Sequence, residues 1–282
     1  MGKGQEGNAN GTGRKIVSFE NAKPPSVLKT RNAVARSRFE GVLNIVRFNW
    51  QFYALAFAAL AVIAGLVFVS ALPGIFTFAL AIGAATAAFY LCGSLLVSHV
   101  IYDRSDLYRF AWLRKINLPA KGNFINVHSG FDETSVHLQR VFPDADWQIL
   151  DFYNPKIHTE VSIARARKHR PPLPQTIGIQ ADNWPLGSGS ADAVFGLLAV
   201  HEIRSDEGKA AFFGEARRVL RPGGVFVLAE HPRDAANFMA YGPGFLHFFS
   251  ERTWHKAFAE AGFQVADAFG ITPFVRIFVL KK

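Results

Sequence analysis

The stretch from Phe124 to Ser135 (FINVHSGFDETS) has the composition of a strand that leads through a tight turn into a helix. Gly130 in that turn would let the backbone approach a nucleotide-like ligand closely, and acidic Asp132 stands where the helix begins. Asp151 ends the next expected strand, 21 residues after Gly130. A carboxylate at that position can accept hydrogen bonds from two ribose hydroxyls, so the spacing predicts a ribose-containing cofactor.

Two further groups of polar residues follow expected strands and suit proton transfer. They contribute His201, Glu202 and His231 as candidate catalytic residues. Histidine takes up a proton near neutral pH, so His201 is the first choice as a base or orienting group, with His231 next. Neighbours on a strand point apart, so only one of His201 and Glu202 is expected to enter the pocket. A packed, structural histidine remains the alternative for either position.

A metal site is not expected from the sequence. The histidines and glutamates lack a metal-binding spacing such as H-E-x-x-H. Cys92, the single cysteine, lies inside an apolar run, which excludes a disulfide framework and a C-x-x-C site.

The elements that would position these residues alternate between strand and helix after Pro119. The expected strands cover residues 123–129, 146–151, 176–181, 191–200, 225–230, 263–269 and 272–280. Four helical patterns separate them, at residues 133–142, 156–169, 208–220 and 250–262. This order predicts a doubly wound, Rossmann-like α/β domain with seven strands. Ligands of such domains gather at the carboxyl ends of the strands, where the candidate residues stand.

Two segments carry a resemblance to a known family: ADNWPLGSGSADAVFGLLAVHEI (181–203) and EARRVLRPGGVFVLAEH (215–231). They resemble the middle of class I S-adenosylmethionine-dependent methyltransferases, which place an Arg-x-Leu-Lys-Pro-Gly-Gly turn before the fifth strand. Here the counterpart is Arg218 to Gly224. The resemblance covers about residues 120–281 and implies a methyltransferase fold, with S-adenosylmethionine as the cofactor.

The glycine motif departs from the family's acidic-x-Gly-x-Gly-x-Gly pattern. Of its three glycines the chain keeps Gly130, while His128 and Asp132 replace the others. Asp132 and Glu133 could bind the cofactor's ammonium group or only complement the helix N-terminus. The resemblance further implies Asp151 as the ribose ligand and Asp182, with Asn183, beside the adenine. Spacing alone fits NAD equally well, and the Arg-Pro-Gly-Gly turn favours S-adenosylmethionine.

A long uncharged run precedes this domain. No Asp, Glu, Lys or Arg occurs between Phe48 and Tyr102, and two apolar stretches in it, 49–72 and 75–100, each exceed the roughly 20 residues that span a bilayer. Pro73 and Gly74 separate them, which predicts a two-helix transmembrane hairpin. Basic residues flank both outer ends, so both termini are expected in the cytoplasm.

The charge of +9 is concentrated near the N-terminus, where residues 1–47 carry nine Lys or Arg against three Glu. A basic arm beside an apolar run favours an anionic membrane surface over nucleic acid as the partner. We expect residues 1–47 to form this arm, its first 25 or so residues disordered and residues 30–47 partly helical at the interface. Residues 48–102 would be the hairpin, 103–119 a linker and 120–282 the methyltransferase domain.

The leading functional hypothesis is a membrane-anchored methyltransferase acting on a small-molecule or lipid-like acceptor, such as a thiol, a lipid headgroup or a quinone-like ring. An aromatic segment, residues 235–250, would cover that acceptor. A catalytically silent, membrane-anchored binding protein with the same fold is the alternative, and a nicotinamide-dependent reductase is a third reading. The oligomeric state does not follow from the sequence.

Overall fold

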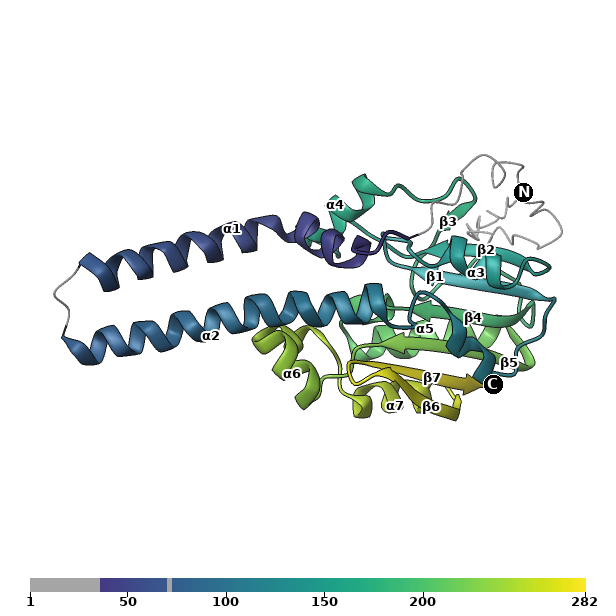
Figure 1. Ribbon diagram of the computed structural model, residues 1–282. Helices are drawn as coiled ribbons and strands as arrows, with labels where there is room; N and C mark the ends of the chain where they lie inside the picture. Colours follow the sequence, from purple (N-terminus) through teal and green to yellow (C-terminus); the bar gives the residue numbers. More distant parts are fainter. Residues whose placement is uncertain (1–35, 70–72) are drawn as a thin grey trace, which may run out of the picture.

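The computed structural model describes residues 36–69 and 73–282. Two long helices project together from one edge of an α/β domain (Figure 1). The basic arm, from residue 1 to residue 35, lies outside the described residues, and so does the start of the turn between the two apolar stretches.

The first projecting helix, α1, spans Glu40–Val69 and is broken at Asn49, where φ is −116°. The second, α2, spans Gly74–His99 and continues into a π-helical turn, η3, at Val100–Arg104. Both helices are long and apolar enough to cross a membrane. Their large apolar side chains are exposed along the projecting part, including Phe52, Phe68 and Ile75. The predicted pair of apolar helices is therefore present.

The part of α1 before the break packs on the α/β domain. Gly41, Asn44 and Phe48 are buried there. The backbone N–H of Gly41 donates to Asp103 (2.6 Å), and the ring of Phe48 lies edge-on to that of Phe131 (5.3 Å). An interfacial helix was expected over residues 30–47, and in its described part the helix begins at Glu40 and buries one side in protein.

The expected linker, residues 103–119, is packed rather than loose. It contains a 3₁₀ turn, η4, at Ala111–Lys115, entered through Phe110 in the left-handed region (φ 58°). Phe110, Trp112 and Leu113 are buried in the apolar layer on one face of the sheet. The hairpin is thereby joined rigidly to the domain.

The sheet has seven strands in the order β3-β2-β1-β4-β5-β7-β6. The strands are β1 Asn123–His128, β2 Asp146–Asp151, β3 Thr176–Gly178, β4 Ala191–Leu197, β5 Leu220–Glu230, β6 Gln264–Thr272 and β7 Val275–Lys281. The first five are parallel, and β7 runs antiparallel between β5 and β6. The predicted doubly wound, Rossmann-like sheet with seven strands is confirmed.

Helices cover both faces of the sheet. The larger apolar core lies under α5 (Asp206–Val219) and α7 (Glu251–Glu260), with Phe213 and Trp254 at its centre. The opposite core lies under α3 (Ser135–Val141) and η4. The side chain of Ser250 caps α7 by accepting from the N–H of Thr253.

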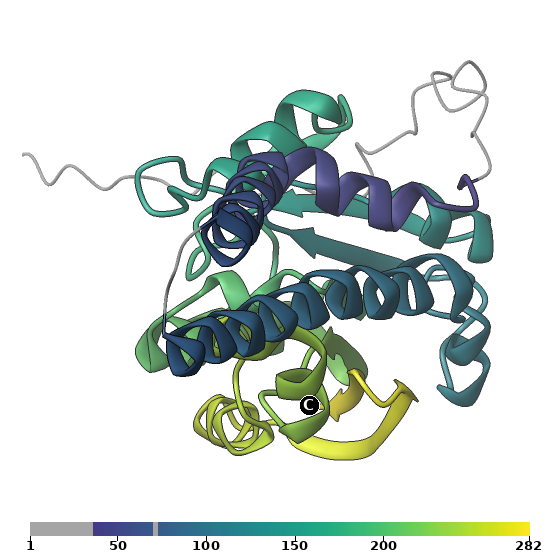
Figure 2. The same cartoon turned by 60° about the vertical axis from the view of Figure 1, so that its left-hand side comes forward.

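Two helices of the domain flank the hairpin (Figure 1). The helix α4 (Val161–His169) lies beside α1, and α6 (Ala235–Tyr241) lies beside α2 (Figures 1 and 2). The rings of Tyr90 on α2 and Phe238 on α6 are 6.4 Å apart. The sequence pattern did not predict α6, which belongs to the aromatic segment expected to cover the acceptor.

Candidate active site

A cavity of about 260 Å³ lies at the carboxyl ends of β1 and β4. The order of the strands reverses between these two, and open α/β sheets bind their ligands at that point. His128 and Ser129 line the cavity from β1, and Leu197 to Ala199 line it from β4. A cavity is therefore present at the carboxyl ends of the strands, where the sequence predicted ligand binding.

The turn after β1 leaves polar atoms without partners. Both ring nitrogens of His128 and the hydroxyl of Ser129 are buried, and none has a hydrogen-bond partner among the described residues. Buried polar atoms are almost always paired, so these indicate a bound ligand or water. Gly130 adopts φ +76°, and a Cβ there would lie 2.8 Å from the ring of Tyr153. A side chain at Gly130 would thus strain the turn and collide with protein.

Asp151 ends β2 and is only 4% exposed. One of its oxygens accepts from the backbone N–H groups of Gly130 (2.8 Å) and Tyr153 (2.9 Å), and the other pairs with Arg167 of α4. Burial alone would raise the pKa of the Asp151 carboxyl, but His128, the Arg167 hydrogen bond and the two N–H groups together lower it. The carboxylate is ionised, and its oxygens are already bonded within the protein.

Asp132 and Glu133, the two acidic residues that follow Gly130, both stabilise neighbouring segments of the fold. One oxygen of Asp132 accepts from the N–H groups of Thr134 and Ser135 and so complements the start of α3, while its other oxygen is buried and unpaired. Glu133 is bound by three side chains: Arg36, Asn44 and Tyr108. Glu133 therefore ties α1, and Arg36 just before it, to the domain.

A second cavity, of about 560 Å³, is lined by Asp151. Its lining includes Tyr153, Gln180 and Asn183. Asp182 is exposed and does not line it. Of the two residues predicted near an adenine ring, the structure thus brings Asn183 to a cavity shared with Asp151.

His201 and Glu202 both line the first cavity. The expectation that only one would enter it was wrong, because they lie on a 3₁₀ turn, η5 (Val200–Glu202), and not on a strand. The Nδ1 of His201 lies 2.7 Å from Glu230, and its Nε2 lies 3.4 Å from Glu202. Burial would lower the pKa of His201, but the two carboxylates raise it to about 10. This shift favours the protonated form of His201, which suits the predicted orienting role better than that of a base.

His231, at the end of β5, is in the opposite state. Its Nδ1 donates to the carbonyl of Phe274 (2.8 Å), and its Nε2 accepts from the hydroxyl of Tyr102 (2.8 Å). Burial lowers the pKa of His231 to about 4. His231 is a neutral imidazole on the cavity wall whose two nitrogens are both engaged.

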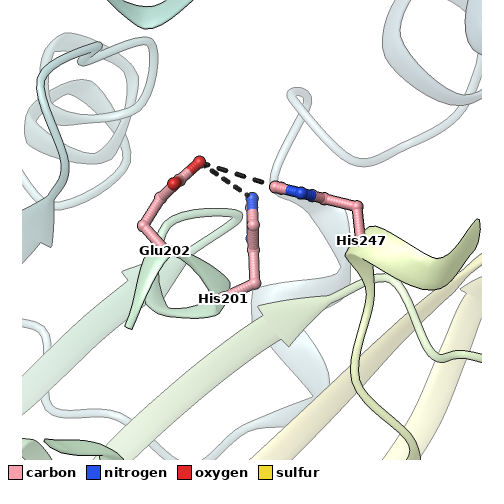
Figure 3. Close-up of side chains that lie close together, drawn as sticks. All are labelled: His201, Glu202 and His247. Carbon is pink, nitrogen blue, oxygen red and sulfur yellow. Dashed lines mark ion pairs between the residues drawn. The ribbon is translucent and has the colours of Figure 1, made fainter. Parts of the chain in front are cut away.

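His247, which the sequence did not single out, completes the group around Glu202. It lies at the end of the 3₁₀ segment η6 (Gly242–His247), and its ring faces His201 and Glu202 (Figure 3). The centroids of the two histidine rings are 5.2 Å apart. No local spacing could reveal this contact, since 45 residues separate His247 from Glu202.

The base of the hairpin forms part of the cavity wall. Ile45, Phe48 and Asn49 of α1 and Tyr102 of η3 line the cavity together with the strand ends. Figure 2 shows the two helices coming forward from this edge of the domain. The apolar helices and the candidate active site are therefore one structural unit.

Comparison with known protein families identifies the α/β domain. Residues 150–228 match the family model described as a methyltransferase domain. The match runs from the end of β2 into β5 and includes the Arg218 to Gly224 turn. The chain carries a class I S-adenosylmethionine-dependent methyltransferase domain. In this domain Arg218 donates to the carbonyls of Trp184 and Leu186, which joins the turn before β5 to the loop before β4.

Solved methyltransferases resemble the domain at low identity. An S-adenosylmethionine-dependent methyltransferase from Aquifex aeolicus is 16% identical, covers 64% of this chain and 94% of its own, and has a TM-score of 0.46. Geranyl diphosphate C-methyltransferase from Streptomyces coelicolor A3(2) is 12% identical, with coverages of 67% and 83% and a TM-score of 0.46. No curated protein sequence matches the chain. The assignment therefore depends on the family match and the strand order.

S-adenosylmethionine is the cofactor of this methyltransferase domain. The residues at the strand ends fit it: the turn at Gly130 has no side chain, and the ring nitrogens of His128 and the hydroxyl of Ser129 are buried without a hydrogen-bond partner among the described residues. Asp151 lines the second cavity, and His128, 3.7 Å from it, lines the first. A ribose at Asp151 would share one carboxylate oxygen with Arg167.

Proposed function

We propose that the protein is a membrane-anchored methyltransferase that transfers the methyl group of S-adenosylmethionine to a small lipophilic acceptor. One observation carries the proposal: the cavity at the methyltransferase edge is walled by Ile45 and Phe48, at the base of an apolar hairpin. A soluble acceptor would not need such a wall. An acceptor dissolved in the bilayer would reach the cavity along the helices that form it.

The hairpin supports anchoring in the membrane. The projecting parts of α1 and α2 expose large apolar side chains that protein does not cover, among them Phe57, Phe68 and Phe78. Exposed apolar surface on this scale needs a lipid or protein partner. Basic residues adjoin the hairpin on the domain side, with Arg47 before it and Arg104 after it. The methyltransferase domain and both termini would accordingly face the cytoplasm.

The lining of the cavity supports a small, mostly apolar acceptor. Phe48, Leu197 and Phe248 provide apolar surface, while His201 and Glu202 provide a charged end. The aromatic segment, residues 235–250, lies beside α2 and exposes Phe238 and Met239 next to it. An amphipathic acceptor such as a thiol, a lipid headgroup or a quinone-like ring fits this combination.

The chain's own residues would bind and orient the reactants. His128, Ser129 and Gly130 would contact the methionine part of the cofactor, Asp132 could offer its free oxygen there, and Asp151 would hold the ribose. Asn183 would contact the adenine in the second cavity, whereas Asp182, which does not line that cavity, would take no part. The cofactor supplies an electrophilic methyl group, so the protein mainly positions the acceptor and excludes water.

In the part of the cavity that would bind the acceptor, His201 would be a cation paired with Glu202 and Glu230. His231 would be neutral there. A protonated His201 donates a hydrogen bond and can orient an acceptor oxygen or sulfur, while His231 keeps Tyr102 of the hairpin in place. An acceptor that must lose a proton would need a different base or an activating ion.

A second candidate function is a membrane-anchored binding protein without catalysis. One observation favours it: Asp151 already accepts from Gly130 and Tyr153 with one oxygen and pairs with Arg167 through the other. A ribose would have to share that second oxygen with Arg167 or displace the arginine. The two candidates therefore differ in whether the cofactor binds at all.

Calorimetry followed by a transfer assay separates the candidates. The purified full chain in detergent is titrated with S-adenosylmethionine and, in parallel, with NADH. It is then mixed with membranes of the producing cells and a tritiated methyl donor. We expect binding of S-adenosylmethionine alone and tritium in the organic extract. Binding without any labelled product would favour the silent protein, and label confined to water-soluble products would refute the lipophilic acceptor.

A further inference from the structure

We propose that His201, Glu202 and His247 form a binding site for a divalent metal ion of the zinc class. One ligand atom from each residue lies within 4.8 Å of the other two. Figure 3 shows the two imidazoles and the carboxylate directed toward a common point, with His201 and Glu202 on η5 and His247 on η6. Two imidazoles and one carboxylate form a ligand set that zinc enzymes use at catalytic sites.

The distances between the ligand atoms are close to those around zinc. Ligand bonds of about 2.0–2.2 Å in a tetrahedron put neighbouring ligand atoms about 3.4 Å apart. The Nε2 of His201 lies 3.4 Å from Glu202, and the Nε2 of His247 lies 4.0 Å from the same oxygen. All three separations are within 4.8 Å, so the His247 ring would have to move closer to complete the geometry.

Glu230 orients His201 for this role. The Glu230 carboxylate accepts from the Nδ1–H of His201 at 2.7 Å. It also accepts from the backbone N–H of His201, so both the ring and the backbone of His201 are held. The Nε2 is then the nitrogen that faces Glu202 and His247. Histidines that bind metals commonly donate their other N–H to a carboxylate in this way.

The ring of His247 makes no hydrogen bond with any residue that the structure describes. Its Nδ1 lies 3.7 Å from Glu160, so its Nε2 is the nitrogen that faces Glu202. Its backbone is fixed, because Arg204 donates to the carbonyls of both His247 (2.7 Å) and His201 (3.0 Å). The two histidine-bearing segments are thus held together with the Nε2 of His247 directed at the proposed site.

The charge and the position of the group suit a catalytic cation. Glu202 and Glu230 bring two carboxylates to His201, and a divalent ion would replace the proton on its Nε2. Three protein ligands leave a fourth position open. His201 and Glu202 line the first cavity, so that position would face the acceptor. This last step rests on the proposed function, whereas the metal site itself does not.

Metal binding by the full chain tests the proposal without donor or acceptor. The protein, purified in detergent with any affinity tag removed, is stripped with a chelator and dialysed. Zinc content is then measured by mass spectrometry, and Co²⁺ is titrated as a spectroscopic probe. We expect one equivalent of either metal and visible absorption bands of bound Co²⁺. The variants His247→Ala and Glu202→Gln should each bind at least 100-fold more weakly.

Two further variants make the result specific. Glu230→Gln should weaken metal binding about 10–100-fold, since Glu230 orients a ligand without being one. His255→Ala removes an exposed histidine on α7 and should bind as the parent does. Absence of stoichiometric metal in the parent protein would overturn the proposal. So would unchanged binding in both His247→Ala and Glu202→Gln. Neither result would bear on S-adenosylmethionine binding, which is measured separately.

Discussion

Arg167 of α4 pairs with the buried carboxylate of Asp151 at the end of β2. The same arginine lies over the ring of Tyr153, 4.9 Å from its centre. Asp151 is the residue that family resemblance assigns to the cofactor's ribose, so protein and cofactor compete for one oxygen. The pairing of α4 with this carboxylate gives the first prediction.

Removing the competitor should strengthen cofactor binding. Arg167→Ala frees one oxygen of Asp151, and the pair is partly exposed, so we expect a gain of about 1 kcal/mol, or about fivefold in the dissociation constant. Asp151→Ala should weaken binding by about 1–3 kcal/mol, the range for hydrogen bonds to a charged group. Calorimetry with S-adenosylmethionine measures both. Equal affinities in parent, Arg167→Ala and Asp151→Ala would refute the ribose role of Asp151.

The base of the hairpin should be sensitive to a single methyl group. A Cβ at Gly41 would collide with the Cβ of Tyr102, so Gly41→Ala must move α1 away from η3. We expect a loss of about 1–3 kcal/mol in the free energy of unfolding and a lower rate of methyl transfer.

Gly83→Ala is the matched control, because nothing lies within 4 Å of a Cβ at that position on α2. It should leave both stability and transfer close to those of the parent. Thermal unfolding in detergent and the tritium assay provide the two measurements. If Gly41→Ala behaves like Gly83→Ala, the hairpin base does not shape the cavity.

His231 should make stability depend on pH. Its pKa is about 4 in the folded protein, because burial outweighs the attraction of Glu230, and is 6.5 for an ordinary histidine. Between pH 6.5 and pH 4 the unfolded chain therefore binds a proton that the folded chain does not. The free energy of unfolding should fall by up to about 3 kcal/mol as pH drops through this range.

His231→Asn tests that origin, because the asparagine N–H can still donate to the carbonyl of Phe274. The variant should lose the His231 share of the pH dependence. The free energy of unfolding, measured by urea titration at several pH values, should then change less steeply with pH between pH 6.5 and pH 4. If the free energy of unfolding depends on pH equally in the variant and the parent, His231 does not contribute to that dependence.

The sequence allowed much of the fold to be predicted because each strand of the sheet is a short apolar run with its own boundaries. The second strand was placed at Asp146–Asp151, as observed. The expected helix over residues 156–169 begins only at Val161. Helix α6 was missed because its seven residues are too few for a clear helical period.

The candidate site was predictable only where it follows strand ends. His128, Gly130, Asp151, His201 and His231 all stand at that edge because parallel strands bring their carboxyl ends together. Contacts across the fold were not predictable from local patterns. Three contacts join segments that lie far apart in the chain: Arg167 with Asp151, His247 with Glu202, and Phe48 with Phe131.

The orientation of the hairpin is tested by limited proteolysis. In sealed vesicles from producing cells, the methyltransferase domain should be cut by protease added from the cytoplasmic side and be protected from the opposite side. The basic residues that flank the hairpin give the reason. Survival of the domain during cytoplasmic digestion would reverse the proposed topology.

Surface dilution tests the central claim, that the acceptor reaches the cavity from the bilayer. The full chain is placed in vesicles that contain the total lipid extract of producing cells, and methyl transfer from a tritiated donor into the organic phase is measured. Inert phosphatidylcholine then dilutes that extract within the bilayer, at a constant bulk concentration of extract. We predict that the rate falls with the mole fraction of extract in the membrane. A rate that follows only the bulk concentration, or no label in the organic phase, would contradict the account.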